Sequence, residues 1–205
     1  MNENRSCILA PRLWNGVLSL MKLALATALV LIAALILGWN DPRPGRPPDW
    51  QVPDLPLCLE ASADQVNVLL LRYSGGDFTF EAETLPLSGS DLNGYGLVYR
   101  AQDTAHYYTF AIGSDGYYAV LRVEGGEETP LVDWQQFPHI RRGRQPNCLR
   151  LTCVGSTCRF YINDEYAIAV EEDTWLTGDV GLWTCGFEGE SVVVQFVNAR
   201  VWAEE

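Results

Sequence analysis

The sequence predicts an all-β domain behind one N-terminal transmembrane helix. Around eleven short runs rich in β-branched and aromatic residues follow one another downstream of residue 57, separated by Gly, Asn, Asp and Ser. No window keeps a 3.6-residue apolar period for more than two turns, which argues against a helical domain. So many short strands in one domain are typical of a sandwich, a jelly roll or a barrel.

The expected strands alternate between apolar and polar residues, or form short apolar runs between turn residues. They are Val66–Tyr73, Phe78–Leu85, Tyr95–Arg100, His106–Ile112, Tyr117–Val123, Pro130–Trp134, Leu149–Val154, Thr157–Ile162, Tyr166–Glu171, Val180–Cys185 and Val192–Trp202.

The best-defined part of the pattern is the meander 93–123. If Asp115-Gly116 forms a two-residue type I′ turn, Ile112 faces Ala119 and Phe110 faces Leu121. One face of this sheet is then apolar and the other semi-polar. The expected apolar face carries Tyr108, Phe110, Ile112, Ala119, Leu121 and Val123, and the expected semi-polar face carries Tyr107, Thr109, Ala111, Tyr118, Val120 and Arg122.

Residues 17–39 form the only long apolar run, with Lys22 near one end where its side chain can reach the interface. A cleaved signal peptide is the alternative, but no Ala-x-Ala site follows the run. We therefore expect an uncleaved anchor. Arg5, Arg12 and Lys22 place the tail, residues 1–16, in the cytoplasm by the positive-inside rule.

Residues 40–56 hold six of the eleven prolines, a composition that predicts a stiff tether between the anchor and the domain. Residues 57–205 are the predicted β-sandwich domain. Together these segments predict a single-pass protein of the cell membrane whose C-terminal domain is extracytoplasmic.

Charge excludes one class of partner. From Asn40 onward the chain has 25 acidic residues against 11 arginines and no lysine. Such a domain lacks the positive charge that nucleic-acid binding requires, so we expect no nucleic-acid partner. The basic cluster at Arg141, Arg142 and Arg144 is expected to pair with local carboxylates, with an anionic ligand as the alternative.

Few residues suggest catalysis or metal binding. Glu81 and Glu83 are spaced as two carboxylates on one strand face, which glycoside hydrolysis could use, although a solvated strand face explains them too. His106 and His139 have no Cys or His at ligand spacing, so we predict no metal site and no cofactor.

Four side chains of the meander are the candidate ligand-binding residues. In the register above, Tyr107 and Tyr118 lie with Arg100 and Arg122 on the semi-polar face. Aromatic rings with polar neighbours are surfaces on which sugar rings stack. The alternative is that another sheet or a long loop covers them.

A disulfide bond is predicted between Cys153 and Cys158. A two-residue type II′ turn at Gly155-Ser156 would place the two cysteines opposite each other, with Cα atoms about 4.5 Å apart. That spacing is within the range that disulfides tolerate. The pairing of Cys58, Cys148 and Cys185 cannot be read from their positions.

Four segments together resemble the concanavalin A-like lectin and glucanase superfamily, and more narrowly laminin G-like and 3-keto-disaccharide-hydrolase-like domains. They are GYGLVYRAQDTAHYYTFAI, SDGYYAVLRV with PLVDW, NCLRLTCVGSTCRFYIND, and GDVGLW with VVVQFVNARV. The resemblance implies a two-sheet antiparallel jelly-roll sandwich that binds carbohydrate or acts as an adhesive module. The Glu-x-Asp-x-x-Glu signature of family 16 glycoside hydrolases is missing, which argues against catalysis.

These observations favour a membrane-anchored, extracytoplasmic, lectin-like module that binds carbohydrate or a surface partner without catalysing a reaction. A glycoside hydrolase of the 3-keto-disaccharide type is one alternative. A structural or sensor domain with no small ligand is the other.

Overall fold

The computed structural model describes residues 19–30, 45–52, 56–187 and 189–204. The chain divides into two compact units, Met1–Arg43 and Pro44–Glu205. In the first unit residues 19–30 form a helix, and among the described residues no helix is long and apolar enough to cross a membrane. The predicted span 17–39 lies partly outside the described residues, and the predicted tail 1–16 lies entirely outside them.

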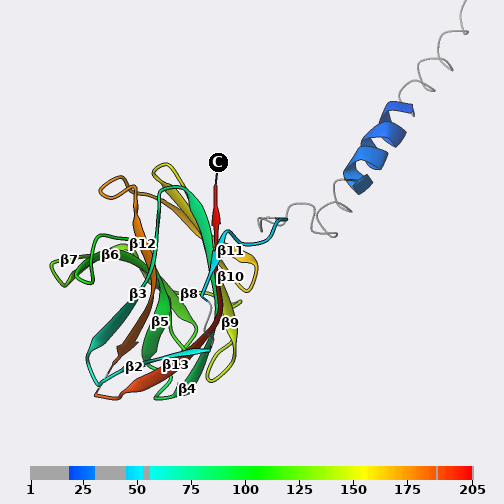
Figure 1. The fold of residues 1–205 in the computed structure, drawn as a ribbon. Coiled ribbons are helices and arrows are strands. Elements are labelled where there is room, and N and C mark those ends of the chain that lie inside the picture. Colours follow the sequence, from blue (N-terminus) through cyan, green and yellow to red (C-terminus); the bar gives the residue numbers. More distant parts are fainter. Residues whose placement is uncertain (1–18, 31–44, 53–55, 188, 205) are drawn as a thin grey trace, which may run out of the picture. The chain divides into compact units, whose positions relative to one another are not determined.

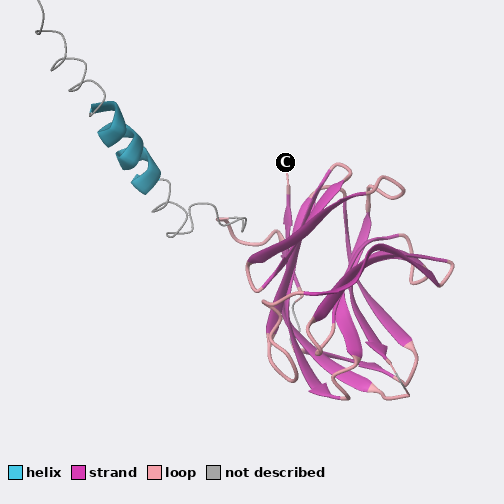
Figure 2. Ribbon diagram, turned by 180° about the vertical axis from the view of Figure 1, so that it is seen from behind, coloured by secondary structure: helices cyan, strands magenta, loops and turns pink. Residues whose placement is uncertain are grey.

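The second unit consists of two antiparallel sheets (Figure 1). Sheet A has the strand order β1-β13-β4-β9-β10-β11, with β2 also paired to β13, and sheet B has the order β3-β12-β5-β6-β7-β8. In the described part of this unit the regular structure is all strand (Figure 2). The predicted two-sheet antiparallel sandwich is confirmed. The strands are β1 (Trp50–Gln51), β2 (Leu57–Ala61), β3 (Val66–Gly75), β4 (Phe78–Ser88), β5 (Asn93–Ala101), β6 (His106–Ile112), β7 (Tyr117–Glu124), β8 (Glu127–Gln136), β9 (Asn147–Val154), β10 (Thr157–Ile162), β11 (Glu165–Glu171), β12 (Gly178–Gly186) and β13 (Val192–Ala203).

The main core lies between the two sheets, because alternate residues of each strand point to the same side. Phe80 and Phe160 contribute from sheet A, and Leu97 and Phe110 from sheet B; all four are fully buried. The rings of Phe110 and Phe160 meet with centroids 4.9 Å apart, which joins the two layers.

All eleven predicted strands are present, but two others were not expected. Trp50–Gln51 belongs to the range predicted as tether, yet it pairs with β13 as strand β1. Leu57–Ala61 forms β2 on the same strand. A two-residue strand has no alternation to detect, and β1 is held largely by flanking contacts, such as the bond from the Trp202 indole N–H to the Arg46 carbonyl at 2.8 Å.

The predicted register between β6 and β7 is wrong by one residue. Ile112 faces Tyr118, not Ala119, and Phe110 faces Val120. The loop is longer than the expected two residues: the N–H of Gly113 bonds to the carbonyl of Tyr117, and Gly116, with a φ of 95°, lies in the left-handed region. This geometry matches a three-residue hairpin loop whose last residue has a positive φ. The faces of β7 are therefore exchanged relative to the prediction.

The predicted hairpin at Gly155-Ser156 is confirmed. Cys153 faces Cys158, Val154 faces Thr157, and Gly155 has a φ of 56°. The two cysteines form a disulfide bond with a Cα–Cα distance of 4.1 Å. Cys58 is an exposed free thiol and Cys185 a buried one, and Cys148 is half-buried on β9.

Candidate functional site

The outer face of sheet B, the side turned away from sheet A, carries its own apolar cluster. Trp183, Tyr107 and Val98 are buried here, and Trp134 and Phe187 pack against them half-buried. Large aromatic residues on the open side of a sandwich are unusual for a surface that meets only solvent. This face is therefore the first place to look for a binding site.

Sheet B curls toward this outer face. Trp134 lies on β8 and Phe187 directly follows β12, with β5, β6 and β7 between these two strands. Four strand spacings amount to roughly 19 Å in a flat sheet. The two ring centroids are only 6.2 Å apart, in an edge-to-face arrangement. Curvature of the sheet, together with the position of Phe187 in the loop after β12, brings these rings together.

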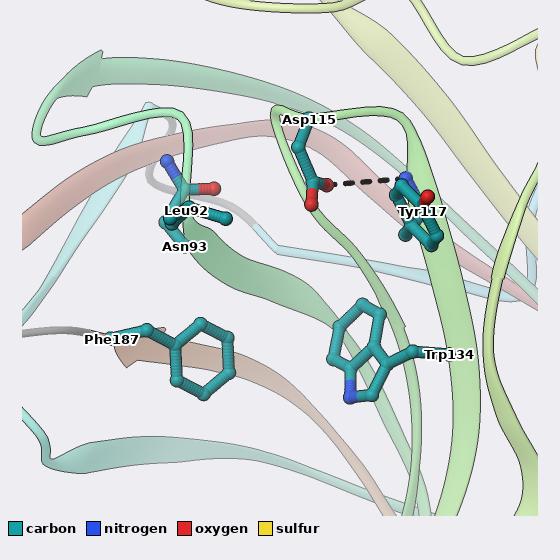
Figure 3. Close-up of a pocket in the computed structure, with 6 residues that line it drawn as sticks. All are labelled: Leu92, Asn93, Asp115, Tyr117, Trp134 and Phe187. Atoms are coloured by element: carbon teal, nitrogen blue, oxygen red, sulfur yellow. Dashed lines mark hydrogen bonds between the residues drawn. The ribbon is translucent and has the colours of Figure 1, made fainter.

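A pocket of about 200 Å³ opens at this contact. Figure 3 shows the rings of Phe187 and Trp134 next to each other, with the turn from Asp115 to Tyr117 nearby. We call this site the aromatic pocket; it is lined by Leu92, Asn93, Asp115, Tyr117, Trp134 and Phe187. Tyr117 is 37 % exposed, so its ring is also offered to solvent.

The polar groups of the aromatic pocket come from the turn that the sequence register misplaced. Asp115 Oδ1 accepts the N–H of Tyr117 at 3.2 Å, the bond drawn in Figure 3. Asn93 is buried and fixes the same turn, because its Oδ1 accepts both the N–H and the hydroxyl of Ser114 at 3.2 and 3.1 Å. A Cβ at Gly113 would lie 2.4 Å from Asp115 Oδ1, so this turn requires glycine there. Asn93 is thus a positioning residue, and Asp115 offers a carboxylate oxygen to a ligand.

A second cavity, of about 370 Å³, opens elsewhere on the outer face of sheet B. We call it the Glu128 cavity; it is lined by Val66, Asn67, Val68, Thr104, Ala105, Tyr107, Val123, Gly126 and Glu128. Residues of β3 and β8, the two edge strands of sheet B, line the same space, which is further evidence that the sheet curls.

The four predicted ligand-binding residues do not form one surface. Tyr107 lies on the outer face of sheet B and lines the Glu128 cavity. Tyr118 lies in the core between the sheets, where its ring packs on Phe137 and its hydroxyl accepts the side-chain N–H of Gln135 at 2.7 Å. The register shift explains this difference, because it moves Tyr118 to the opposite face of the sheet from Tyr107.

The two arginines of that prediction have internal partners. Arg100 is 1 % exposed, and its Nη2 donates to the carbonyls of Gly76 and Gly155 at 3.2 and 2.6 Å. Arg122 donates to the Thr174 hydroxyl at 3.2 Å and lies 3.7 Å from a Glu172 carboxylate oxygen. Contact of any of these four residues with a ligand stays a prediction, but a shared semi-polar surface is not formed.

Glu81 and Glu83 lie on the outer face of sheet A, away from both cavities. Glu81 is 1 % exposed and accepts from Arg200 at 2.6 Å and from Arg150 at 3.4 Å. Glu83 accepts from the side-chain amide of Asn198 at 2.8 Å. Two arginines engage Glu81, so this pair does not resemble the acid and base of a glycoside hydrolase.

The basic cluster lies beside the aromatic pocket. Neither Arg141, Arg142 nor Arg144 forms an ion pair with a described carboxylate, contrary to expectation. The Gly143 N–H bonds to the Ser114 carbonyl at 2.8 Å, which fastens this loop to the turn that carries Asp115. Positive charge therefore lies at the rim of the aromatic pocket, although the domain as a whole is acidic.

No protein-family model and no curated protein matches the sequence. Solved structures do match. The carbohydrate-binding module CBM66 from Bacillus subtilis is similar with a TM-score of 0.61 and 18% identity, over 70% of this chain and 86% of that one. A functionally unknown protein from Saccharomyces cerevisiae is similar with a TM-score of 0.53 and 14% identity, over 77% and 94%. Galectin LEC-6 from Caenorhabditis elegans reaches a TM-score of 0.44 at 14% identity, over 74% and 94%.

The first two of these structures share the fold of the Pro44–Glu205 unit, a two-sheet antiparallel sandwich.

Proposed function

We propose that this protein is a carbohydrate-binding module that holds a sugar unit in the aromatic pocket and catalyses no reaction. The observation that carries the proposal is the combination of Trp134, Phe187 and Tyr117 around the Asp115 carboxylate on a curved sheet. Sugar rings stack their C–H faces on aromatic rings, while a few convergent polar groups orient the hydroxyls. The fold shared with the Bacillus carbohydrate-binding module supports the same function.

The test is binding of a glycan array, followed by affinity electrophoresis on the polysaccharides that bind. Trp134→Ala should weaken binding at least tenfold, because truncation of an aromatic residue at the centre of a binding site costs about 2 kcal/mol or more when that residue is a hot spot. Tyr166→Ala is the matched control, since Tyr166 is 55% exposed on β11 of sheet A. Binding of a protein partner and of no glycan would favour a structural or sensor domain instead. Glycan binding that Trp134→Ala leaves unchanged would move the site elsewhere.

We also propose that residues 17–39 anchor the module in a membrane, with the domain on the extracytoplasmic side. The apolar run, its flanking Arg5 and Arg12, and the Cys153–Cys158 disulfide support this arrangement. Protease added to intact spheroplasts should release the domain. Full protection of the domain until the membrane is broken would refute the orientation.

A further inference from the structure

The Glu128 cavity holds a carboxylate without a counter-charge. The Glu128 carboxylate has no hydrogen bond or ion pair with any residue that the structure describes, and none of the nine lining residues is basic. The wall is mixed: Val66, Val68, Ala105 and Val123 are apolar, whereas Asn67 and Thr104 bring polar groups. A carboxylate without a counter-charge favours a ligand that brings a positive charge.

A second side chain of this cavity is fixed by the fold. Tyr107 lines the cavity and is 2 % exposed, so it forms part of the wall. Its hydroxyl can take part in a hydrogen bond. Beneath it, the indole N–H of Trp183 is fully buried without a hydrogen bond of ordinary geometry to a described group.

The charged state of the cavity depends on Glu128 alone. Burial, opposed by the Trp183 N–H and reinforced by Glu128, raises the pKa of Tyr107 to about 12. Burial, together with the charges of Glu128 and Asp64, raises the pKa of the Cys185 thiol to about 12. Both groups are therefore neutral near neutral pH. Glu128 is exposed as a residue, yet protein atoms crowd its carboxyl enough to raise its pKa as well.

We propose that the Glu128 cavity is a binding site for a small molecule that carries a protonated amine, with the ammonium group on Glu128 and the adjoining carbon skeleton against Tyr107 and the valines. The strongly acidic balance of the domain attracts such a ligand at long range. This proposal does not rest on the proposed function, because the Glu128 cavity and the aromatic pocket share no lining residue.

Glucosamine and glucose are matched probes, since they differ in one position, an ammonium group against a hydroxyl. The full chain in detergent micelles, with ¹⁵N label, would be titrated with each at a pH where the amine is protonated and Glu128 ionised. Glucosamine should shift the amide signals of Ala105, Gly126 and Glu128. Glucose at the same concentration should leave them in place.

Glu128→Gln should weaken glucosamine binding roughly tenfold or more, as expected for loss of a charge-assisted hydrogen bond. Glu127→Gln, which removes the same charge one residue away outside the cavity, should retain most of the binding. Trp134→Ala should keep it too, which separates this site from the aromatic pocket. Equal binding of glucose and glucosamine, unchanged binding in Glu128→Gln, or no shift at these amides would each overturn the proposal.

Discussion

On the outer face of sheet A, Glu81 and Arg150 are both buried and bonded to each other, and Arg200 completes the group. On the outer face of sheet B, Asp115 and Glu128 lie beside cavities and have no ion pair with a described residue. Both faces use charged and aromatic side chains. What separates them is whether the charged side chains pair with one another or stay available to a ligand. The face with available groups is the one to test for ligands.

Removing one member of the sheet A network should have the largest effect on stability. Arg150→Ala removes one of the two arginines that pair with the buried Glu81, and breaking a buried pair in this way typically costs about 3–5 kcal/mol. Arg159→Ala, on an exposed position of the neighbouring strand β10, is the control. Urea denaturation followed by tryptophan fluorescence would measure the difference. A cost below that of the control would mean that the network is not structural.

A smaller loss is expected when the sheet B face is overpacked. A Cβ at Gly94 would lie 2.6 Å from the Trp183 ring and 3.2 Å from Phe187. Gly94→Ala should therefore cost about 1–3 kcal/mol, and it should also weaken glycan binding because Phe187 lines the aromatic pocket. Gly45→Ala, where nothing lies within 4 Å, should change neither property. Unchanged glycan binding in Gly94→Ala would contradict the inference that the outer face of sheet B is the ligand-binding face.

Loss of the disulfide should cost a similar amount. The bridge closes a loop with a sequence separation of only 5, for which chain entropy predicts about 2 kcal/mol. The double variant Cys153→Ala, Cys158→Ala should lower the midpoint of thermal unfolding accordingly and leave glucosamine and glycan binding unchanged. A change in binding would mean that the structure of the sheet A hairpin affects the binding sites on the outer face of sheet B.

The smallest effect concerns an exposed pair at the edge of sheet A. The Ala203 N–H, and then Arg46, lower the pKa of the Asp49 carboxyl from its ordinary value of 3.8. Its contribution to stability is therefore present above that value and lost as the pH falls through the lower folded-state pKa. Because the pair is exposed, Asp49→Asn should change the acid limb of a pH–stability curve only slightly. A shift as large as that of Arg150→Ala would show that exposed and buried pairs are equivalent here.

Eleven of the strands were predictable from the sequence because each alternates between apolar and polar residues or forms a short apolar run between turn residues. The turns were predictable only where loop length was unambiguous. At Gly155-Ser156 the loop has the expected two residues, and Cys153 faces Cys158. At Asp115-Gly116 the loop also includes the preceding Ser114, so it is one residue longer than expected. That one extra residue misplaced Tyr118.

The candidate site was harder to predict for a different reason. Trp134 and Phe187 are far apart in the sequence, and their contact depends on the curvature of sheet B and on the loop after β12. Nothing in the alternation of a single strand encodes curvature. Trp134 belongs to the motif PLVDW, which the sequence analysis identified, but its contact with Phe187 could not be predicted.

Arg100, expected to touch a ligand, joins the two sheets instead. Its backbone lies on β5 of sheet B with a positive φ of 50°, and its guanidinium reaches the Gly155 carbonyl at the disulfide-bonded hairpin of sheet A. This hydrogen bond connects the two sheets at the end of the sandwich where these residues lie. Local opening should therefore differ between the two ends of the sandwich. We expect amide hydrogens near Arg100 to exchange slowly with solvent, and those beside Phe187 and Asp115 to exchange faster.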